Sequence, residues 1–188
     1  MNWKMDVKHN PWDHIIIDNI FNDYEWNLIL ESAKIIELNS KDGVNFIEMA
    51  KSIEMGVPAE TSDIIINFAD YMLEYYIDIM SKFKNHEMSN IGYICKPQWG
   101  VTKNTIEELH DDRYKDMSLN ICVTNNSNGT NLFRDGEYHS TISKTNTGLL
   151  FCSEKNVTLH NIDASDSTII YLNVFFYKID PWYDDVYL

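Results

Sequence analysis

The stretch from residue 148 to residue 178, GLLFCSEKNVTLHNIDASDSTIIYLNVFFYK, decides the fold class of this chain. It contains short apolar runs at 148–152, 156–160 and 167–178, separated by clusters of Asn, Ser and Asp. Short runs bounded by turn-forming residues are typical of β-strands, whereas a helix shows apolar positions three and four residues apart over about ten residues or more. This part of the chain therefore predicts strands joined by polar turns.

The same texture extends upstream to residue 92. Further candidate strands lie at 92–95, 98–102, 117–124 and 130–134, and the polar segment 125–129 is a predicted turn. No helical pattern separates these runs, which favours an antiparallel sandwich or barrel over a fold of alternating strands and helices.

The N-terminal part has a different pattern. Residues 12–21 predict a strand that leads into a helix, and Asn22 with Glu25 forms a capping signal for that helix. A second helix, capped by Thr61 or Ser62, carries apolar residues at helical spacing as far as Phe83. We expect one domain, residues 1–188, of α+β but mainly β class, with helical support at 18–86 packed on one outer face of a β core at 90–178.

Composition limits the function classes. The 188 residues include 44% hydrophobic residues and carry a net charge of −14, so the chain suits a compact globular domain and a nucleic-acid partner is not expected. Three cysteines far apart in sequence predict neither a disulfide framework nor a zinc site. No stretch approaches the ~20 apolar residues of a membrane span, and we expect a cytoplasmic protein with no membrane association.

Candidate metal ligands follow the helical half. His110 and Asp112 are two residues apart and, if they lie on a strand, point to the same side, while His160 ends the run 157–160 on another strand. Two histidines and one carboxylate bind a divalent metal and leave three coordination positions open, as in non-haem Fe(II) oxygenases. Asp111 and His139 are the alternative ligands, and a hydrogen bond between His110 and Asp112 within a loop is the structural alternative.

The order of these motifs resembles the 2-oxoglutarate and Fe(II)-dependent dioxygenases, in particular the short prolyl-hydroxylase-like proteins. The resemblance rests on the His110-Asp111-Asp112 triplet, the Gly-Thr-x-Leu run at 129–132, the Gly-Leu-Leu-Phe run at 148–151, and His160 before a long final strand. The opening segment 11–21 is also similar to the strand that enters the first helix of that family.

This resemblance implies a double-stranded β-helix, also called a jelly roll, supported by N-terminal helices. It further implies that His110, Asp112 and His160 are iron ligands and that 2-oxoglutarate and O₂ are co-substrates in the hydroxylation of a small molecule or peptide. A degenerate oxygenase-fold binding protein and a cupin-like metal enzyme with another co-substrate are the alternatives. The substrate and the oligomeric state are not predicted.

The final strand departs from the family pattern. Most members carry an Arg or Lys about ten residues after the distal histidine, where it pairs with the far carboxylate of 2-oxoglutarate, but residues 161–177 contain neither. Arg134 is the first candidate to replace that cation. The neutral donors considered for the co-substrate are Tyr93, Ser167, Thr168 and Tyr171, and the weaker basic candidates, which we place in loops, are Arg113, Lys115 and Lys144.

Overall fold

The computed structural model describes residues 3–75, 78–79, 93–112, 115–124, 130–142 and 144–178, without the side chains of 140–142. The predicted turn at 125–129, the last turns of the second helix, Arg113 and the C-terminal segment 179–188 lie outside the described residues.

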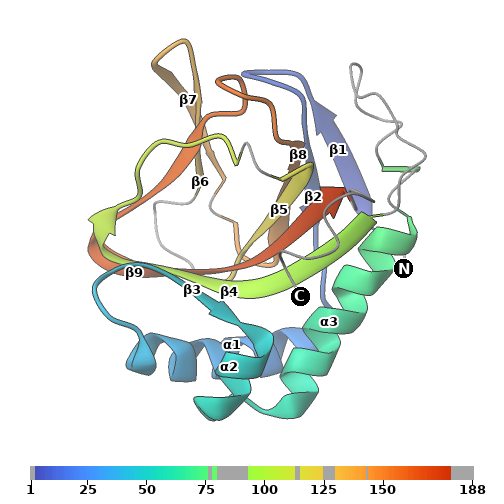
Figure 1. Cartoon of the computed structure of the whole chain (residues 1–188), viewed down its shortest axis with the longest axis vertical. Helices are drawn as coiled ribbons and strands as arrows, with labels where there is room; N and C mark the ends of the chain where they lie inside the picture. Colours follow the sequence, from blue (N-terminus) through green and yellow to red (C-terminus); the bar gives the residue numbers. More distant parts are fainter. Residues whose placement is uncertain are drawn as a thin grey trace.

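The elements follow one another as a short β-hairpin, helices interrupted by one strand, and then strands alone (Figure 1). The helices are α1 (Asp23–Asn39), α2 (Met49–Glu54) and α3 (Ala59–Glu74). The strands are β1 (Lys4–Lys8), β2 (His14–Asp18), β3 (Gly43–Glu48), β4 (Tyr93–Ile106), β5 (Met117–Cys122), β6 (Thr130–Arg134), β7 (Glu137–Ile142), β8 (Thr147–Cys152) and β9 (His160–Lys178).

These strands form a strongly curled antiparallel sheet. Its main path runs in the order β1-β2-β8-β5-β9-β4-β3, while β6 pairs with β7 and with the beginning of β9. The long strands β4 and β9 pair along most of their length, so that β9 passes from the main path to the β6 side (Figure 1). The predicted class, mainly β with a jelly-roll architecture and supporting helices, is confirmed.

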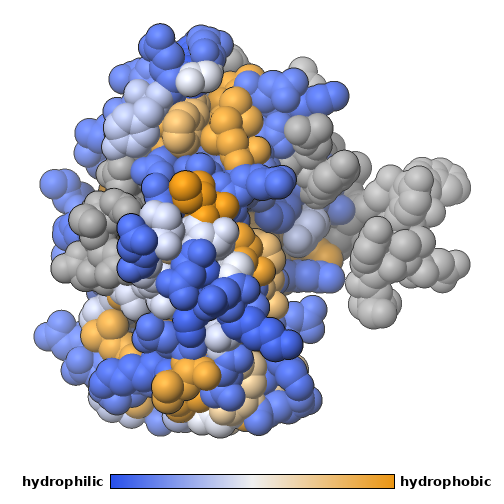
Figure 2. Space-filling view, turned by 90° about the vertical axis from the view of Figure 1, so that its left-hand side faces the viewer, coloured by the Kyte–Doolittle hydropathy of each residue, from blue (hydrophilic) through white to orange (hydrophobic). Residues whose placement is uncertain are grey.

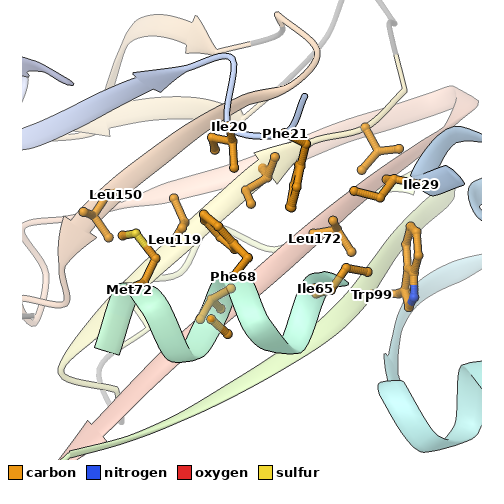
Figure 3. Packing of buried hydrophobic residues seen from close by; sticks show 14 of the residues in the cluster. Ile20, Phe21, Ile29, Ile65, Phe68, Met72, Trp99, Leu119, Leu150 and Leu172 are labelled. Carbon is orange, nitrogen blue, oxygen red and sulfur yellow. The ribbon is translucent and has the colours of Figure 1, made fainter. Parts of the chain in front are cut away.

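The helices cover the outer face of the curled sheet. Their apolar side chains meet alternate residues of the central strands, which face outward because side chains on a strand alternate between its two faces. Figure 3 shows Ile65 and Phe68 of α3 close to Leu119 and Leu172 of the sheet, and all four are buried. This cluster is the main core. It attaches the helices to the outer face of the sheet, which leaves the inner face for the site.

The inner face is more polar. Tyr171, Asn173 and Phe175 alternate along β9 with residues of the main core, and Asn120 of β5 pairs in register with Asn173. A smaller apolar cluster of Trp12, Leu132, Leu149 and Phe151 closes part of this interior. The inner face therefore combines buried amides with aromatic rings.

Several strand boundaries differ from the sequence prediction. The two runs 92–95 and 98–102 form one strand, β4, because Pro97 lies just beyond the last β3 pair, Glu48 with Gln98, where its missing N–H interrupts no ladder with β3. Likewise β9 begins at His160 and includes the polar segment that we expected to be a turn, since that segment pairs with β6 and the end of β4. Strands β1, β3 and β7 were not predicted.

One of the two predicted helix starts is confirmed and the other is wrong. At α1 the Asn22 side chain accepts from the Glu25 backbone N–H and the Glu25 carboxylate accepts from the Asn22 N–H, which confirms the capping box. At α3 the predicted caps are wrong: the helix begins at Ala59 after Pro58, and Thr61 and Ser62 are buried within its first turns. The Pro58 carbonyl accepts from the Thr61 N–H in the first turn, and the Thr61 side chain accepts from Ser32 of α1 instead of capping the helix.

One face of the molecule is mainly hydrophilic. Figure 2 shows one face on which hydrophilic side chains dominate and hydrophobic ones form small separate groups. Among the described residues, no helix is both long and apolar enough to cross a membrane.

Candidate metal centre

Three of the predicted site residues meet inside the curled sheet. His160 begins β9, and His110, in the segment after β4, forms a single antiparallel bridge with it through two backbone hydrogen bonds of 3.1 and 2.9 Å. One ligand atom from each of His110, Asp112 and His160 lies within 4.8 Å of the others. The bridge thus joins two segments fifty residues apart in sequence into one cluster of metal-binding groups.

Asp112 reaches this cluster by a turn rather than by strand alternation. Strand β4 ends at Ile106, and Asp112 has a φ of 53°, in the left-handed region that Asp adopts more readily than most residues. The expectation that His110 and Asp112 share one face of a strand is therefore wrong. The left-handed turn places the Asp112 Oδ1 atom 3.6 Å from His110 Nε2 and its Oδ2 atom 3.7 Å from His160 Nε2.

Both imidazoles are held in the orientation that a metal ligand needs. The Nδ1 atom of His110 lies 2.8 Å from the carbonyl oxygen of Glu108, and that of His160 lies 3.0 Å from the carbonyl oxygen of Thr158. A neutral imidazole whose Nδ1–H donates to a carbonyl carries its lone pair on Nε2. Both lone pairs are then on the nitrogens that face Asp112.

Asp112 is held as a carboxylate. Burial alone would raise its pKa, but the charge of His160, present only in acid where that imidazole is protonated, the charge of Lys115, and hydrogen bonds from Lys115 and Ser118 lower the pKa below its ordinary value. The Ser118 hydroxyl donates to Oδ2 at 2.7 Å, and the Lys115 ammonium pairs with Oδ1. These contacts orient both carboxylate oxygens.

His160 is held neutral. Its side chain is 2% exposed, and burial lowers its pKa to about 4, with Asp112 opposing the shift. The ring packs edge-on to Phe151, with 4.8 Å between ring centroids. A neutral imidazole at physiological pH is the form that coordinates a metal.

A pocket opens from the triad toward the inner face of the sheet. The cavity itself is narrow, with a volume of about 10 Å³ that holds about one water molecule, and the space of about 230 Å³ around it includes open solvent. The side chains that line it are Phe46, Glu107, His110, Asp112, Lys115, Asn120, His160, Ile162, Tyr171, Asn173 and Phe175. Glu107 is itself buried, which raises its pKa, and lies 3.9 Å from His110 Nε2. The pocket therefore joins a candidate metal site to a space lined by polar and aromatic groups.

Of the residues predicted for the co-substrate, Tyr171 lines this pocket. Arg134 does not: its Nη1 donates to the Pro11 carbonyl at 2.7 Å. Tyr93 packs against the main core on the opposite face of the sheet, and Ser167 and Thr168 are half-buried in β9 outside the pocket lining.

The alternative ligands and cations lie elsewhere, with one exception. The Asp111 carboxylate accepts from the Asn156 N–H at 2.7 Å, and His139 is exposed on β7. Lys144 pairs with Asp18 on the surface. Lys115 is the exception, since it lines the pocket with its ammonium 3.3 Å from the centre of the Phe175 ring.

Sequence reasoning overlooked four polar residues around the triad, Glu107, Ser118, Asn120 and Asn173. A signal for three of them was present in the sequence. Ser118 and Asn120 alternate with apolar residues in β5, and Asn173 interrupts an otherwise apolar and aromatic run in β9. A polar residue inside a buried strand needs a partner on the inner face, and here that face forms the pocket.

Comparison with known proteins gives a likeness in structure alone, because no family model and no curated protein matches the sequence. A viral collagen prolyl hydroxylase from Paramecium Bursaria Chlorella virus-1, solved with 2OG, matches with a TM-score of 0.56 at 13% identity over 89% of this chain and 96% of that one. A prolyl hydroxylase from Trichoplax adhaerens, in complex with a peptide fragment, gives 0.60 at 10% identity over 88% and 83%.

The structural neighbours also differ in the reaction that they catalyse. The non-heme alpha ketoglutarate dependent epimerase SnoN of nogalamycin biosynthesis matches with a TM-score of 0.56 at 9% identity over 88% of this chain and 76% of that one. At these identities the likeness shows the fold, and one fold carries several reactions. The chain has the jelly-roll fold of the 2-oxoglutarate and Fe(II) oxygenases, with a His-Asp-His cluster inside it.

Proposed function

We propose that this protein is a non-haem Fe(II), 2-oxoglutarate-dependent dioxygenase that hydroxylates a small-molecule or peptide substrate. The observation that carries the proposal is the cluster of His110, Asp112 and His160, whose ligand atoms lie within 4.8 Å of one another, with the two imidazole Nε2 atoms 3.6 and 3.7 Å from the Asp112 carboxylate. Two neutral imidazoles and one carboxylate suit a divalent first-row metal and leave positions for other ligands. The donor set therefore fits Fe(II).

The surrounding residues have defined tasks in this proposal. The carbonyl oxygens of Glu108 and Thr158 fix the imidazole tautomers, and Ser118 and Lys115 keep Asp112 ionised and oriented. When bound, Fe(II) would supply open coordination positions for a 2-oxo acid and O₂, the chemistry of hydroxylation coupled to decarboxylation. Apolar side chains such as Ile162 and Phe175 limit water around these positions.

Metal binding by single variants tests the ligand assignment. We expect His110→Ala, Asp112→Ala and His160→Ala each to lose Fe(II) or Mn(II) in equilibrium dialysis with elemental analysis, while each variant stays folded by circular dichroism. His139→Ala is the matched control, because His139 is an exposed histidine of β7, and it should bind one metal like the unsubstituted protein. Full metal content in all three triad variants would exclude this site.

A second measurement tests the co-substrate. Anaerobic addition of 2-oxoglutarate to the Fe(II)-loaded protein should shift its absorption if the 2-oxo acid binds at the metal. Metal binding with no response to 2-oxoglutarate would favour the cupin-like alternative with another co-substrate. No metal binding at all would favour the degenerate binding protein.

A further inference from the structure

The second carboxylate of 2-oxoglutarate needs a partner in the pocket, and the described residues offer no uncommitted cation there. Residues 161–177 contain no Lys or Arg. Lys115 is the basic residue among the described pocket-lining side chains, and its ammonium is already paired with the Asp112 carboxylate and seated on the Phe175 ring. The Lys115 charge therefore neutralises Asp112 and is not available at the distal end of the pocket, where the second carboxylate would lie.

A buried amide in the same pocket lacks a partner. The side chain of Asn173 is 2% exposed, and its Oδ1 atom has no hydrogen-bond partner among the described residues. Asn120, 7% exposed, is its register neighbour on β5 and lines the same pocket. Leaving a buried polar atom unpaired is costly unless a ligand or an ordered water completes its hydrogen bonding. The Asn173 amide thus has an unfilled hydrogen-bonding position beside Asn120 on the pocket lining.

Tyr171, two residues before Asn173 on β9, adds a neutral hydroxyl to the lining of the same pocket. Its ring occupies the space above Gly100 of β4, where any side chain would overlap it, and its hydroxyl lies 3.4 Å from Thr102 Oγ1. Burial raises the pKa of this phenol above its ordinary value, so the hydroxyl keeps its proton. Donors on this part of the inner face are therefore neutral.

The spacing suits a five-carbon acid. Lys115, bonded to Asp112, sits over Phe175, and Asn173 is the next residue of β9 on the same face. Alternate residues on a strand are ~6.6 Å apart. The two carboxyl carbons of extended 2-oxoglutarate, four single bonds apart, are separated by about 5 Å. An acid whose first carboxylate lies beside Phe175 and which extends along β9 would therefore place its second carboxylate near Asn173.

We propose that Asn120 and Asn173, assisted by the Tyr171 hydroxyl, form a neutral subsite for the distal carboxylate of the co-substrate, in place of a cation. This inference rests on the proposed function, because it assumes that a 2-oxo acid binds at the triad. The amide groups donate N–H bonds to the carboxylate, and for Asn173 the amide is rotated so that its nitrogen takes the position of the unpartnered Oδ1 atom, because the two orientations of an amide exchange oxygen and nitrogen.

The test compares two ligands that differ only at the distal end. Binding of 2-oxoglutarate and of 2-oxopentanoate, which lacks the distal carboxylate, is measured by calorimetry on the Mn(II)-loaded protein. Two or three hydrogen bonds from neutral donors to the distal carboxylate predict a preference for 2-oxoglutarate of about 10- to 100-fold. Asn173→Leu should lower this preference by at least about fivefold, and the isosteric Asn173→Asp should abolish it by adding a negative charge. Binding of 2-oxopentanoate should change little in either variant, which also shows that each remains folded.

Two control variants test whether a basic side chain, and not the amide pair of Asn120 and Asn173, binds the distal carboxylate. Lys115→Met and Arg113→Gln should keep the preference, even if Lys115→Met changes the affinity for both acids equally. Loss of the preference in either control, with the preference retained in Asn173→Leu, overturns the neutral subsite and leaves the proposed function intact. Equal binding of the two acids by the unsubstituted protein also overturns it. If the metal-loaded protein binds neither acid, the proposed function itself fails.

Discussion

The burial of His160 predicts a specific loss of stability in acid. In the folded protein its pKa is lowered to about 4, whereas in the unfolded chain it returns to the ordinary histidine value of 6.5. Between these values the unfolded state binds more protons than the folded state, so the free energy of unfolding decreases as the pH falls. The contribution of His160 is complete above about pH 6.5 and is lost progressively toward about pH 4.

The expected magnitude follows from the size of the shift. A lowering of the His160 pKa from 6.5 to about 4 corresponds to ~3 kcal/mol in the free energy of unfolding between pH values well above and well below both pKa values. At about pH 5, above the pI near 4.6, roughly 2 kcal/mol of this should already be lost relative to about pH 7.5. Glu107 acts in the opposite direction, because burial raises its pKa and the folded state then holds a proton that the unfolded state releases as the pH rises.

Comparison with His160→Gln isolates the histidine from Glu107 and the other carboxylates. Urea unfolding of both proteins is measured with a chelator present at about pH 5 and about pH 7.5, so that bound metal does not add to stability. The substitution should cost ~2 kcal/mol less at the lower pH, because the unsubstituted protein has lost that contribution there. His9→Gln is the control, since His9 is exposed. An equal cost of His160→Gln at both pH values would refute the reasoning.

Three further substitutions test the fold and the site. Gly100→Ala should destabilise the protein by ~1–3 kcal/mol in urea unfolding, because its methyl group would overlap the Tyr171 ring, and the same substitution should cost much less in a Tyr171→Ala background, where that ring is absent. Asn22→Ala removes the α1 cap and should cost ~1 kcal/mol by the same assay, whereas an unchanged midpoint would show that the capping box contributes nothing. Arg134→Gln should leave the affinity for 2-oxoglutarate unchanged in calorimetry, because the guanidinium bonds the Pro11 carbonyl outside the pocket, and a tenfold weaker affinity would restore Arg134 as the anchor.

Some elements form through residues that are close together in the sequence, and these could be predicted. The α1 capping box needs residues three apart, and strands such as 148–152 follow from short apolar runs bounded by turn residues, so both could be predicted. The triad residues could also be named from their types and order, although strand alternation was the wrong reason for Asp112. The extent of β9 could not be predicted, because its polar beginning is a strand only by pairing with β6 and β4.

The tertiary structure decided which side chains share the pocket. Arg134 and Lys115 are both basic residues downstream of the triplet, and the sequence favoured Arg134 because a strand was predicted around it. The curl of the sheet directs Arg134 toward Pro11 and brings Lys115 over Phe175, sixty residues away in sequence. Asn120 and Asn173 likewise become neighbours through the register of β5 with β9. Sequence patterns report which face of a strand a residue occupies, whereas the pairing of distant strands sets which residues meet across that face.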